Sequence, residues 1–207
     1  MSTLDSKIAD KTPQWRDSAL KIAMRQQLSP GMIICLFLYY GIAKRLPDSP
    51  MPGSRLSNKL RVLLAGRLFR KVGNSVKIHS GVCFGTGLNI EIGDYSSLNH
   101  DCWIANDTII GNDVMMGPEV IILSGSHNFN RTDIPMREQG APPRKPVVVG
   151  DDVWIGTRSI ILPGVKIGSH SIIGAGSVVT KDVEEWSVMA GNPAKFIRSR
   201  VADRANI

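Results

Sequence analysis

The sequence predicts an all-β solenoid, and two features of its repeat pattern carry that prediction. The first is a period of six, because an aliphatic residue or methionine returns at every sixth position in two runs. The second is a small residue, mostly glycine, directly after most of these positions. The twelve periodic positions are Ile92, Leu98, Ile104, Ile110, Met116, Ile122, Val149, Ile155, Ile161, Ile167, Ile173 and Val179. Agreement of this length at one phase does not arise by chance, so the repeat defines the fold class.

A period of six fits neither a helix nor simple strand alternation, but it fits a short strand followed by a tight turn. Three such units would form one three-sided coil, and stacked coils bury the aliphatic side chains that no single unit can bury. We expect a parallel β-helix of about four to five coils over residues 73–185. Residues 1–72 would form a helical N-terminal cap, and residues 186–207 a tail with a short helix. A solenoid with another coil length is the alternative.

The N-terminal third concentrates the positive charge of the chain. The formal net charge is +7, and residues 44–77 contain nine Lys or Arg and one acid, Asp48. The apolar run Met32–Ala43 is shorter than the about 20 residues of a membrane span, so we expect a helix packed on the solenoid's end. The basic run Lys59–Lys71 would cap the first coil or, alternatively, lie on an anionic membrane face. Its predicted apolar side consists of Leu60, Leu63, Leu64 and Leu68.

The composition favours a cytoplasmic protein. The three cysteines have neither metal-ligand spacing nor the even number of a disulfide framework. Cys102 occupies an inward position of the repeat, so we expect it in the core. The first residues are polar and acidic, which does not suggest a signal peptide. The basic segment lacks interleaved aromatic residues, and we therefore expect no nucleic-acid partner.

The repeat breaks between its two runs, where residues 126–145 are polar, proline-rich and too irregular for a coil. Long loops on rigid scaffolds are usually functional. His127 stands at the start of this loop, where the scaffold would fix it and a substrate could still reach it. Because imidazole titrates near neutrality, His127 is a candidate general base for a hydroxyl. His79 precedes the regular repeat and His170 takes an outward position, so both have weaker cases.

Four motifs on this background resemble those of the hexapeptide-repeat O-acetyltransferases, the family of the galactoside, maltose and exopolysaccharide acetyltransferases. They are Ser126-His127-Asn128, Asp152-Val-Trp-Ile-Gly156, the run from Ile173 to Lys181, and Gly191-Asn-Pro-Ala-Lys195. The resemblance implies a left-handed β-helix, acetyl-CoA as co-substrate without a metal, and a homotrimer with sites between adjacent subunits. It also implies direct acetyl transfer, in which both substrates are held together and no acyl-enzyme forms.

The resemblance assigns roles to individual residues. His127 would deprotonate the acceptor hydroxyl, and Asn99 would orient the acceptor. A backbone N–H at Gly156 or Thr157 would stabilise the developing oxyanion, which typically lowers a barrier by ~3–4 kcal/mol. The residues that would hold coenzyme A are Trp154, Ala175, Thr180 and Lys181, with Lys195 and Arg198 near its nucleotide end.

The front of the chain narrows the expected acceptor. Residues 1–60 do not match the helical module of the small sugar acetyltransferases and look more like the exopolysaccharide branch. We therefore expect a sugar hydroxyl in a surface or exopolysaccharide precursor, with peripheral contact at the inner membrane face if that precursor is lipid-linked. The candidate acceptor contacts are His100, Phe129, Arg131, Asp133 and Arg137.

Other functions stay open at this stage. The acceptor could instead be maltose, a galactoside, an antibiotic, serine or an amino sugar. A γ-carbonic-anhydrase-like metal lyase is a remoter alternative, because it needs three histidines at an interface and only His100 and His127 could approach each other. A non-catalytic assembly solenoid would leave the loop and His127 without a purpose.

Overall fold

The structure is a computed structural model that describes residues 28–201 of the 207-residue chain. The chain divides into two units, Met1–Ile34 and Cys35–Ile207. Helix α2 (Pro30–Gly41) begins in the first unit and ends in the second. All other described helices and strands belong to the second unit, which therefore contains the solenoid.

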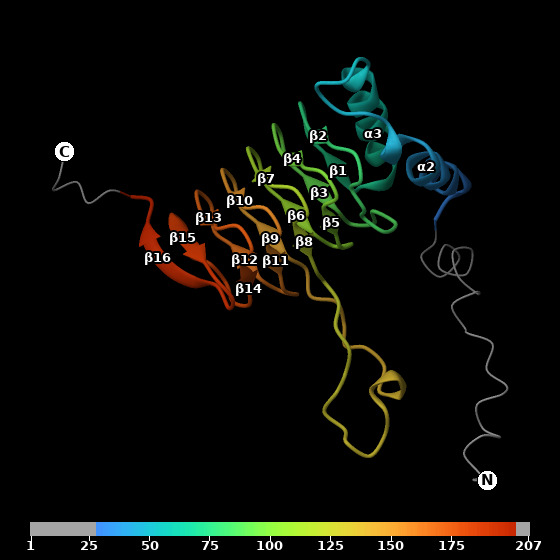
Figure 1. Cartoon of the computed structure of the whole chain (residues 1–207). Coiled ribbons are helices and arrows are strands. Elements are labelled where there is room, and N and C mark those ends of the chain that lie inside the picture. Colours follow the sequence, from blue (N-terminus) through green and yellow to red (C-terminus); the bar gives the residue numbers. More distant parts are fainter. Residues whose placement is uncertain (1–27, 202–207) are drawn as a thin grey trace, which may run out of the picture. The chain divides into compact units, whose positions relative to one another are not determined.

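The solenoid consists of three sheets, called A, B and C here, which the chain visits in turn (Figure 1). Sheet A contains β1 (Lys71–Val72), β3 (Glu91–Ile92), β6 (Ile109–Ile110), β9 (Val148–Val149) and β12 (Lys166–Ile167). Sheet B contains β2 (Lys77–Ile78), β4 (Ser97–Leu98), β7 (Met115–Met116), β10 (Trp154–Ile155), β13 (Ile172–Ile173), β15 (Ser187–Ala190) and β16 (Lys195–Ser199). Sheet C contains β5 (Trp103–Ile104), β8 (Ile121–Ile122), β11 (Ile160–Ile161) and β14 (Val178–Val179).

Neighbouring strands of a sheet come from successive coils. Trp154 of β10 pairs in parallel with Ile172 of β13, three hexads later. Across the long loop, Ile109 of β6 pairs with Val148 of β9 in the same way, so the inserted residues do not disturb the stack. The pairing confirms the predicted parallel β-helix. Sheet B has seven strands, so the stack extends somewhat beyond the four to five coils that we predict.

The chain passes between the sheets at three edges. The A–B edge contains residues 93–96, 111–114, 150–153 and 168–171. The B–C edge contains residues 99–102, 117–120, 156–159 and 174–177. The C–A edge contains residues 123–147, 162–165 and 180–182, and thus the long loop with its short helix η4 (Met136–Glu138).

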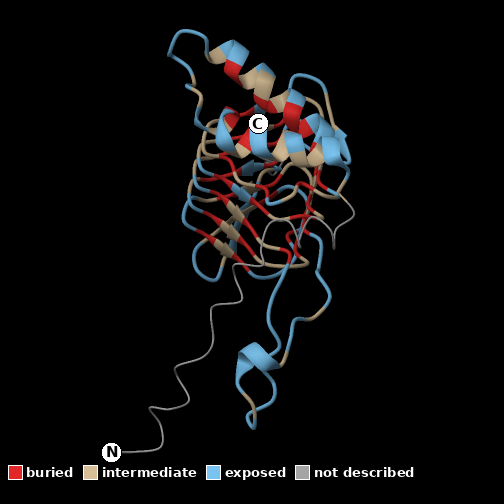
Figure 2. Ribbon diagram, turned by 90° about the vertical axis from the view of Figure 1, so that its right-hand side faces the viewer, coloured by how far each residue is buried: buried red, intermediate tan, exposed pale blue. Residues whose placement is uncertain are grey.

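The periodic aliphatic side chains form the core, as predicted (Figure 2). All twelve are buried, and so are the Val, Ser, Thr and Cys residues four positions later, except Ser126 at the start of the long loop, which is exposed. The buried serines bond to the backbone: Ser96 Oγ donates to Gly111 O (2.7 Å) and Ser159 Oγ donates to Gly174 O (3.0 Å). These bonds offset the desolvation of the hydroxyls. Cys102 is one of the core residues, and burial raises the pKa of its thiol to about 11.

The glycines after the periodic positions allow successive coils to approach closely. A Cβ at Gly117 would lie 2.6 Å from the backbone nitrogen of Thr157, and one at Gly156 would lie 2.5 Å from that of Ala175. The left-handed residue of the corner comes later, for example at Arg158 with φ 57°. At these two positions glycine is therefore required by the space between coils and not by its conformational freedom.

The helices η3 (Ala43–Arg45) and α3 (Ser54–Leu68) cap the start of the solenoid, since α3 packs on β1 and β2. At the centre of this contact Arg61 is completely buried. Its Nε donates to Ile78 O (2.7 Å), its Nη1 donates to Ala43 O (3.1 Å) and Leu46 O (2.9 Å), and its Nη2 pairs with the Asp48 carboxylate. A buried guanidinium needs this complete set of acceptors.

One detail of the predicted cap is wrong. Leu64 and Leu68 pack inward as expected, but Leu63 is 61% exposed, because the buried face of α3 also contains Ser57 and Arg61. A leucine count could not identify a face that is centred on an arginine. No helix in the described part of the chain is long and apolar enough to cross a membrane.

The short helix that we predict for the C-terminal tail is not found in its described part, residues 186–201. Residues 187–199 form the antiparallel strands β15 and β16, and β15 pairs with β13. The open end of sheet B offers unpaired backbone groups, which a strand satisfies and a helix does not. Arg200 then bonds to Asp152 Oδ2 (3.1 Å), which His170 Nδ1 also approaches (3.0 Å), while Trp186 stacks on the His170 ring. His170 therefore helps to hold the hairpin at the A–B edge.

Candidate active site

A pocket of about 350 Å³ lies at the C–A edge between the long loop and the coils. Its position follows from the broken repeat, because the inserted residues leave the stack there while later coils continue it. Figure 2 shows the loop standing away from the buried core, with most of its residues exposed. The pocket is lined by Ser126, His127, Asn128 and Phe129 of the loop and by Leu162, Pro163 and Thr180 of later coils, among others.

Hydrogen bonds within the loop give it a defined shape. Asn128 binds across it, because its backbone N–H donates to Gly140 O (3.1 Å) and its Nδ2 donates to Gln139 O (3.0 Å). At the base, the Lys145 N–H donates to Ser124 O (2.8 Å) and thereby closes the insertion. The residues between these two links include His127, so its backbone is fixed on both sides.

His127 is exposed and lines the pocket. Its backbone belongs to the ordered base of the loop, while its side chain is open to a bound molecule. A general base requires both properties, since it must reach the proton of its substrate within a hydrogen-bond distance. The predicted acceptor contact Phe129 lines the same pocket. Thr180, predicted to hold coenzyme A, also lies there.

The other acceptor candidates of the loop are engaged with their neighbours. Arg131 Nε donates to Asp133 Oδ1 (3.0 Å), and Arg137 Nη2 lies 2.6 Å from Glu138 Oε1. Both pairs are exposed and line no wall of the pocket. A bound acceptor would have to compete with these ion pairs, each of which is weak because of its exposure.

Asn99 and His100 lie elsewhere, at the B–C edge. This edge is a ladder of backbone hydrogen bonds, in which His100 O accepts from Glu119 N (2.8 Å) and Thr157 O accepts from Gly176 N (2.8 Å). Gly156 N–H donates to Ile173 O (2.7 Å) within sheet B, so of the two predicted oxyanion donors only Thr157 keeps its N–H outside that ladder.

One chain therefore holds the predicted site in two halves. His127, Phe129 and Thr180 lie at the C–A edge, whereas Asn99 and Thr157 lie at the B–C edge. Between them runs the outer face of sheet C, which is apolar and begins with Trp103, 49% exposed. The rest of that face is formed by the partly exposed Ile121, Ile160 and Val178.

The residues predicted to hold coenzyme A are on the surface. Trp154 is 50% exposed on sheet B, where Met115 of the previous coil lies beside it. Ala175, Thr180 and Lys181 are exposed at the two edges just described. Lys195 and Arg198 are exposed on β16, the outermost strand of sheet B.

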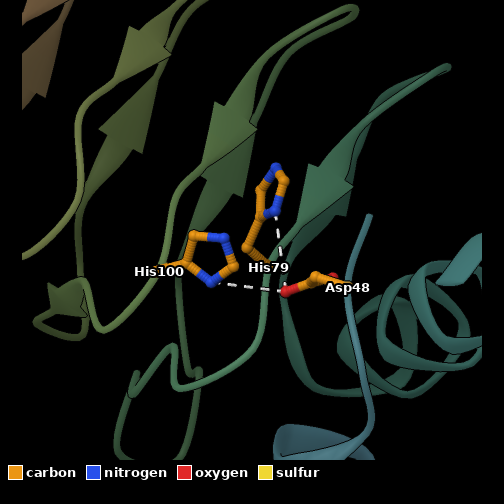
Figure 3. Close-up of side chains that lie close together, drawn as sticks. All are labelled: Asp48, His79 and His100. Atoms are coloured by element: carbon orange, nitrogen blue, oxygen red, sulfur yellow. Dashed lines mark ion pairs between the residues drawn. The ribbon is translucent and has the colours of Figure 1, made fainter. Parts of the chain in front are cut away.

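A second cluster, which the sequence analysis missed, joins Asp48, His79 and His100 (Figure 3). Burial lowers the pKa of His79, although the Asp48 charge opposes this effect. Burial would raise the pKa of Asp48, but hydrogen bonds from Ser80 and the charge of Arg61 lower it. The three residues are the only group of the described chain that could hold a metal ion. Their spacing in sequence gave no signal, because the cap brings Asp48 to the coils.

Comparisons with known proteins agree with this geometry. Residues 146–181 match the family model described as bacterial transferase hexapeptide (six repeats). The galactoside O-acetyltransferase of Escherichia coli K12 is 32% identical over 173 residues, which are 78% of this chain and 84% of that protein. A relative from Schizosaccharomyces pombe is 40% identical over 124 residues, and there the match spans 58% of the relative's length.

Solved structures of acetyltransferases also resemble this chain. A maltose O-acetyltransferase from Clostridium difficile 630 has a TM-score of 0.70 at 30% identity and covers 86% of this chain and 90% of its own. A hexapeptide-repeat acetyltransferase from Vibrio cholerae, complexed with acetyl coenzyme A, has a TM-score of 0.70 at 27% identity. That comparison covers 98% of this chain and 100% of the other.

Proposed function

Because the chain belongs to the hexapeptide-repeat family of acetyl-CoA-dependent O-acetyltransferases, we propose that it transfers an acetyl group to a sugar hydroxyl with His127 as general base. The observation that carries this proposal is the pocket at the C–A edge, where His127 and Thr180 line one cavity. His127 is a candidate base and Thr180 a candidate contact for the pantetheine arm. The acceptor hydroxyl and the thioester of acetyl-CoA would thus meet beside the His127 imidazole.

The reaction follows from these positions. The His127 imidazole takes the proton of the acceptor hydroxyl as that oxygen attacks the thioester carbonyl of acetyl-CoA. The carbonyl oxygen becomes an oxyanion, for which we propose the Thr157 N–H as hydrogen-bond donor. Collapse of the tetrahedral intermediate breaks the carbon–sulfur bond, and the imidazolium returns the proton to the thiolate. The products are the acetyl ester and free coenzyme A.

We propose that the site is completed between subunits of a homotrimer. In one chain the base and the oxyanion donor lie on different edges, with sheet C between them. Trp103 on that sheet, and the neighbours Met115 and Trp154 on sheet B, are large exposed apolar side chains of the kind that oligomer interfaces bury. Packing such surfaces around a threefold axis would bring the B–C edge of one subunit to the C–A edge of the next.

The proposed coenzyme A contacts lie on sheet B and at the B–C and C–A edges. Trp154 and Ala175 would flank the pantetheine arm, and Lys181 beside Thr180 would reach a phosphate. Lys195 and Arg198 on β16 would bind phosphates at the nucleotide end, where charge-assisted hydrogen bonds are strong. Asn99 and His100 would contact the acceptor from the B–C edge, and Phe129 from the loop, with Arg131, Asp133 and Arg137 as outer contacts.

For the acceptor we propose a sugar in a surface or exopolysaccharide precursor, modified in the cytoplasm at the inner membrane face. The cap supports this, because Phe37 and Leu38 on α2, Ile42 directly after it, and Leu56 and Leu63 on α3 are all exposed. Exposed bases on α3 accompany them, namely Arg55, Lys59 and Arg67. Apolar residues among bases are typical of a peripheral contact with anionic lipids. The galactoside O-acetyltransferase relative makes a free galactoside the main competing acceptor.

The test is release of free thiol from acetyl-CoA against a panel of free sugars and lipid-linked oligosaccharides. We expect acceptor-dependent release that falls at least ~10²-fold in the variant His127→Ala, while coenzyme A binding is retained. Lys166→Ala, exposed on sheet A, is the control and should keep its activity. Release that is unchanged in His127→Ala would disprove the role of the base. A strong preference for free galactosides over lipid-linked acceptors would disprove the polysaccharide precursor.

A further inference from the structure

Three side chains from separate segments converge beside the B–C edge (Figure 3). Asp48 belongs to the segment between η3 and α3, His79 follows β2, and His100 follows β4. Asp48 Oδ2 lies 3.6 Å from His79 Nδ1 and 3.4 Å from His100 Nδ1. All three atoms lie within 4.8 Å of one another. Asp48 Oδ2 is thus the common neighbour of both imidazole nitrogens.

Hydrogen bonding within the chain does not account for this convergence. The 3.6 Å separation between Asp48 and His79 is too long for a hydrogen bond. His79 Nδ1 is buried and, within residues 28–201, has no hydrogen-bond partner. His100 Nδ1 has a hydrogen-bond partner in Ser80 Oγ at 3.1 Å, whose hydroxyl can rotate away. A buried imidazole nitrogen without a partner is uncommon and points to a ligand.

The carboxylate is held in place by contacts that leave it able to bind. The Asp48 side chain is only 9% exposed, its Oδ1 pairs with Arg61, and its Oδ2 accepts the Ser80 N–H (2.5 Å). Each carboxylate oxygen has a second lone pair, and metal-binding carboxylates are usually hydrogen-bonded in this way. Arg61 already balances the carboxylate charge, so a hard, oxygen-seeking cation would gain little from this site.

We propose that Asp48, His79 and His100 bind a divalent transition-metal ion of the zinc type. Two imidazoles and one carboxylate are a donor set that zinc accepts, with metal–ligand bonds of about 2.1 Å. A tetrahedron with such bonds places its ligands about 3.4 Å apart, close to the 3.4 and 3.6 Å between the Asp48 oxygen and the two nitrogens. His100 is 40% exposed, so the fourth position faces solvent and takes a water molecule.

The ion would link the cap to the first two coils. Asp48 comes from the cap, His79 from the first coil and His100 from the second, so one ion would tie three segments that are distant in sequence. Asn99 precedes His100 directly and donates no side-chain group to the cluster, but its Oδ1 accepts the His100 N–H (2.8 Å). The site therefore shares His100 with the proposed acceptor contacts and lies next to Asn99, but it contains neither the base nor the oxyanion donor.

The experiment is equilibrium dialysis of the chelator-stripped full chain against Zn²⁺ alone, with the metal per chain measured by mass spectrometry and the unfolding temperature measured in parallel. We expect one Zn²⁺ per chain and a raised unfolding temperature. The variants His79→Asn and His100→Asn should each weaken binding at least about 10-fold and abolish the temperature shift. His170→Asn is the matched control, because His170 also faces a carboxylate, Asp152 at 3.0 Å, but has no third ligand.

Two results would overturn the proposal. One is the absence of stoichiometric Zn²⁺ binding to the wild-type chain. The other is binding that survives in His100→Asn, a partly exposed position at which the variant should fold even if His79→Asn does not. Neither readout depends on acetyl transfer, so the outcome is independent of the proposed function.

Discussion

The B–C and C–A edges of the solenoid are built from the same hexads, but they offer different chemistry. Along the B–C edge the repeat is unbroken after the first coil, and backbone groups stack at fixed spacing, as the bond from Gly176 N to Thr157 O shows. Along the C–A edge the repeat opens after β8, and the loop adds a pocket with His127 in its wall.

The difference shows how a repetitive scaffold acquires a site. An unbroken edge presents backbone N–H groups at fixed spacing and outward side chains, but its glycine positions lie too close to the next coil to leave room for a pocket. A broken edge provides space and a titratable side chain, but no close-packed backbone donors. The proposed acetyl transfer needs both, and the proposed symmetric assembly would let one chain supply them to the same substrate.

The largest effect should come from separating the two edges in one experiment. We expect the variants His127→Ala and Asn99→Ala to be nearly inactive when each is assembled alone. In His127→Ala the rate of acetyl transfer should fall at least ~10²-fold. If each site takes His127 from one subunit and Asn99 from the next, every mixed trimer should contain one complete site of three and regain about one third of the wild-type activity. Co-expression with two affinity tags and a thiol-release assay would measure this. Inactive mixed trimers would place both residues in the same subunit's site.

The outer face of sheet C, which lies between the two edges, is the next place to test by substitution. Trp103→Asp puts a charge on the apolar surface of sheet C, and we expect it to convert the proposed trimer to monomers and to abolish activity with them. Lys166→Asp, exposed on sheet A, is the matched control and should remain trimeric. Light scattering gives the mass of each species. A trimeric Trp103→Asp variant would assign the interface to another face.

Alanine substitutions should reveal the difference in packing between the edges. Gly156→Ala places a Cβ 2.5 Å from the Ala175 backbone, whereas nothing lies within 4 Å of a Cβ at Gly125, at the C–A edge. We expect Gly156→Ala to lower the free energy of unfolding by about 1–3 kcal/mol. Gly125→Ala should change it by less than about 0.5 kcal/mol. Urea unfolding measures both, and equal effects would contradict the assignment of a close-packed and an open edge.

We expect the smallest effect, a change in stability, at the A–B edge. Hydrogen bonding from His170, and then the contact with Arg200, lowers the pKa of Asp152. A lowered pKa contributes stability above the ordinary Asp pKa of about 3.9, and that contribution is lost as the pH falls through the lowered value. Because Asp152 is 47% exposed, we expect Asp152→Asn to reduce the stability at pH 7 by under about 1 kcal/mol. The difference in stability between the variant and the wild type should vanish in acid. Thermal unfolding at several pH values measures it, and a difference that persists in acid would contradict the prediction.

The coils could be predicted because their signal is local and repeated. Ile155, Ile161 and Ile167 each report the same inward position, and every further hexad strengthens the inference. The cap and the tail gave weaker signals. Leu63 was misplaced because Arg61 forms the centre of the buried face, and residues 187–199 became strands because sheet B ends in open hydrogen-bonding groups.

The sequence by itself determined the solenoid, the position of its interruption and His127 at that interruption, because each depends on the distance between residues along the chain. The tertiary structure decided what cannot be expressed as such a distance. It placed His127 and Asn99 on different edges, closed the Gly156 N–H into the sheet ladder, and brought Asp48 from the cap to His79 and His100. The physical reason is that a solenoid stacks residues that are distant in sequence, and only the stacked coordinates say which of them meet.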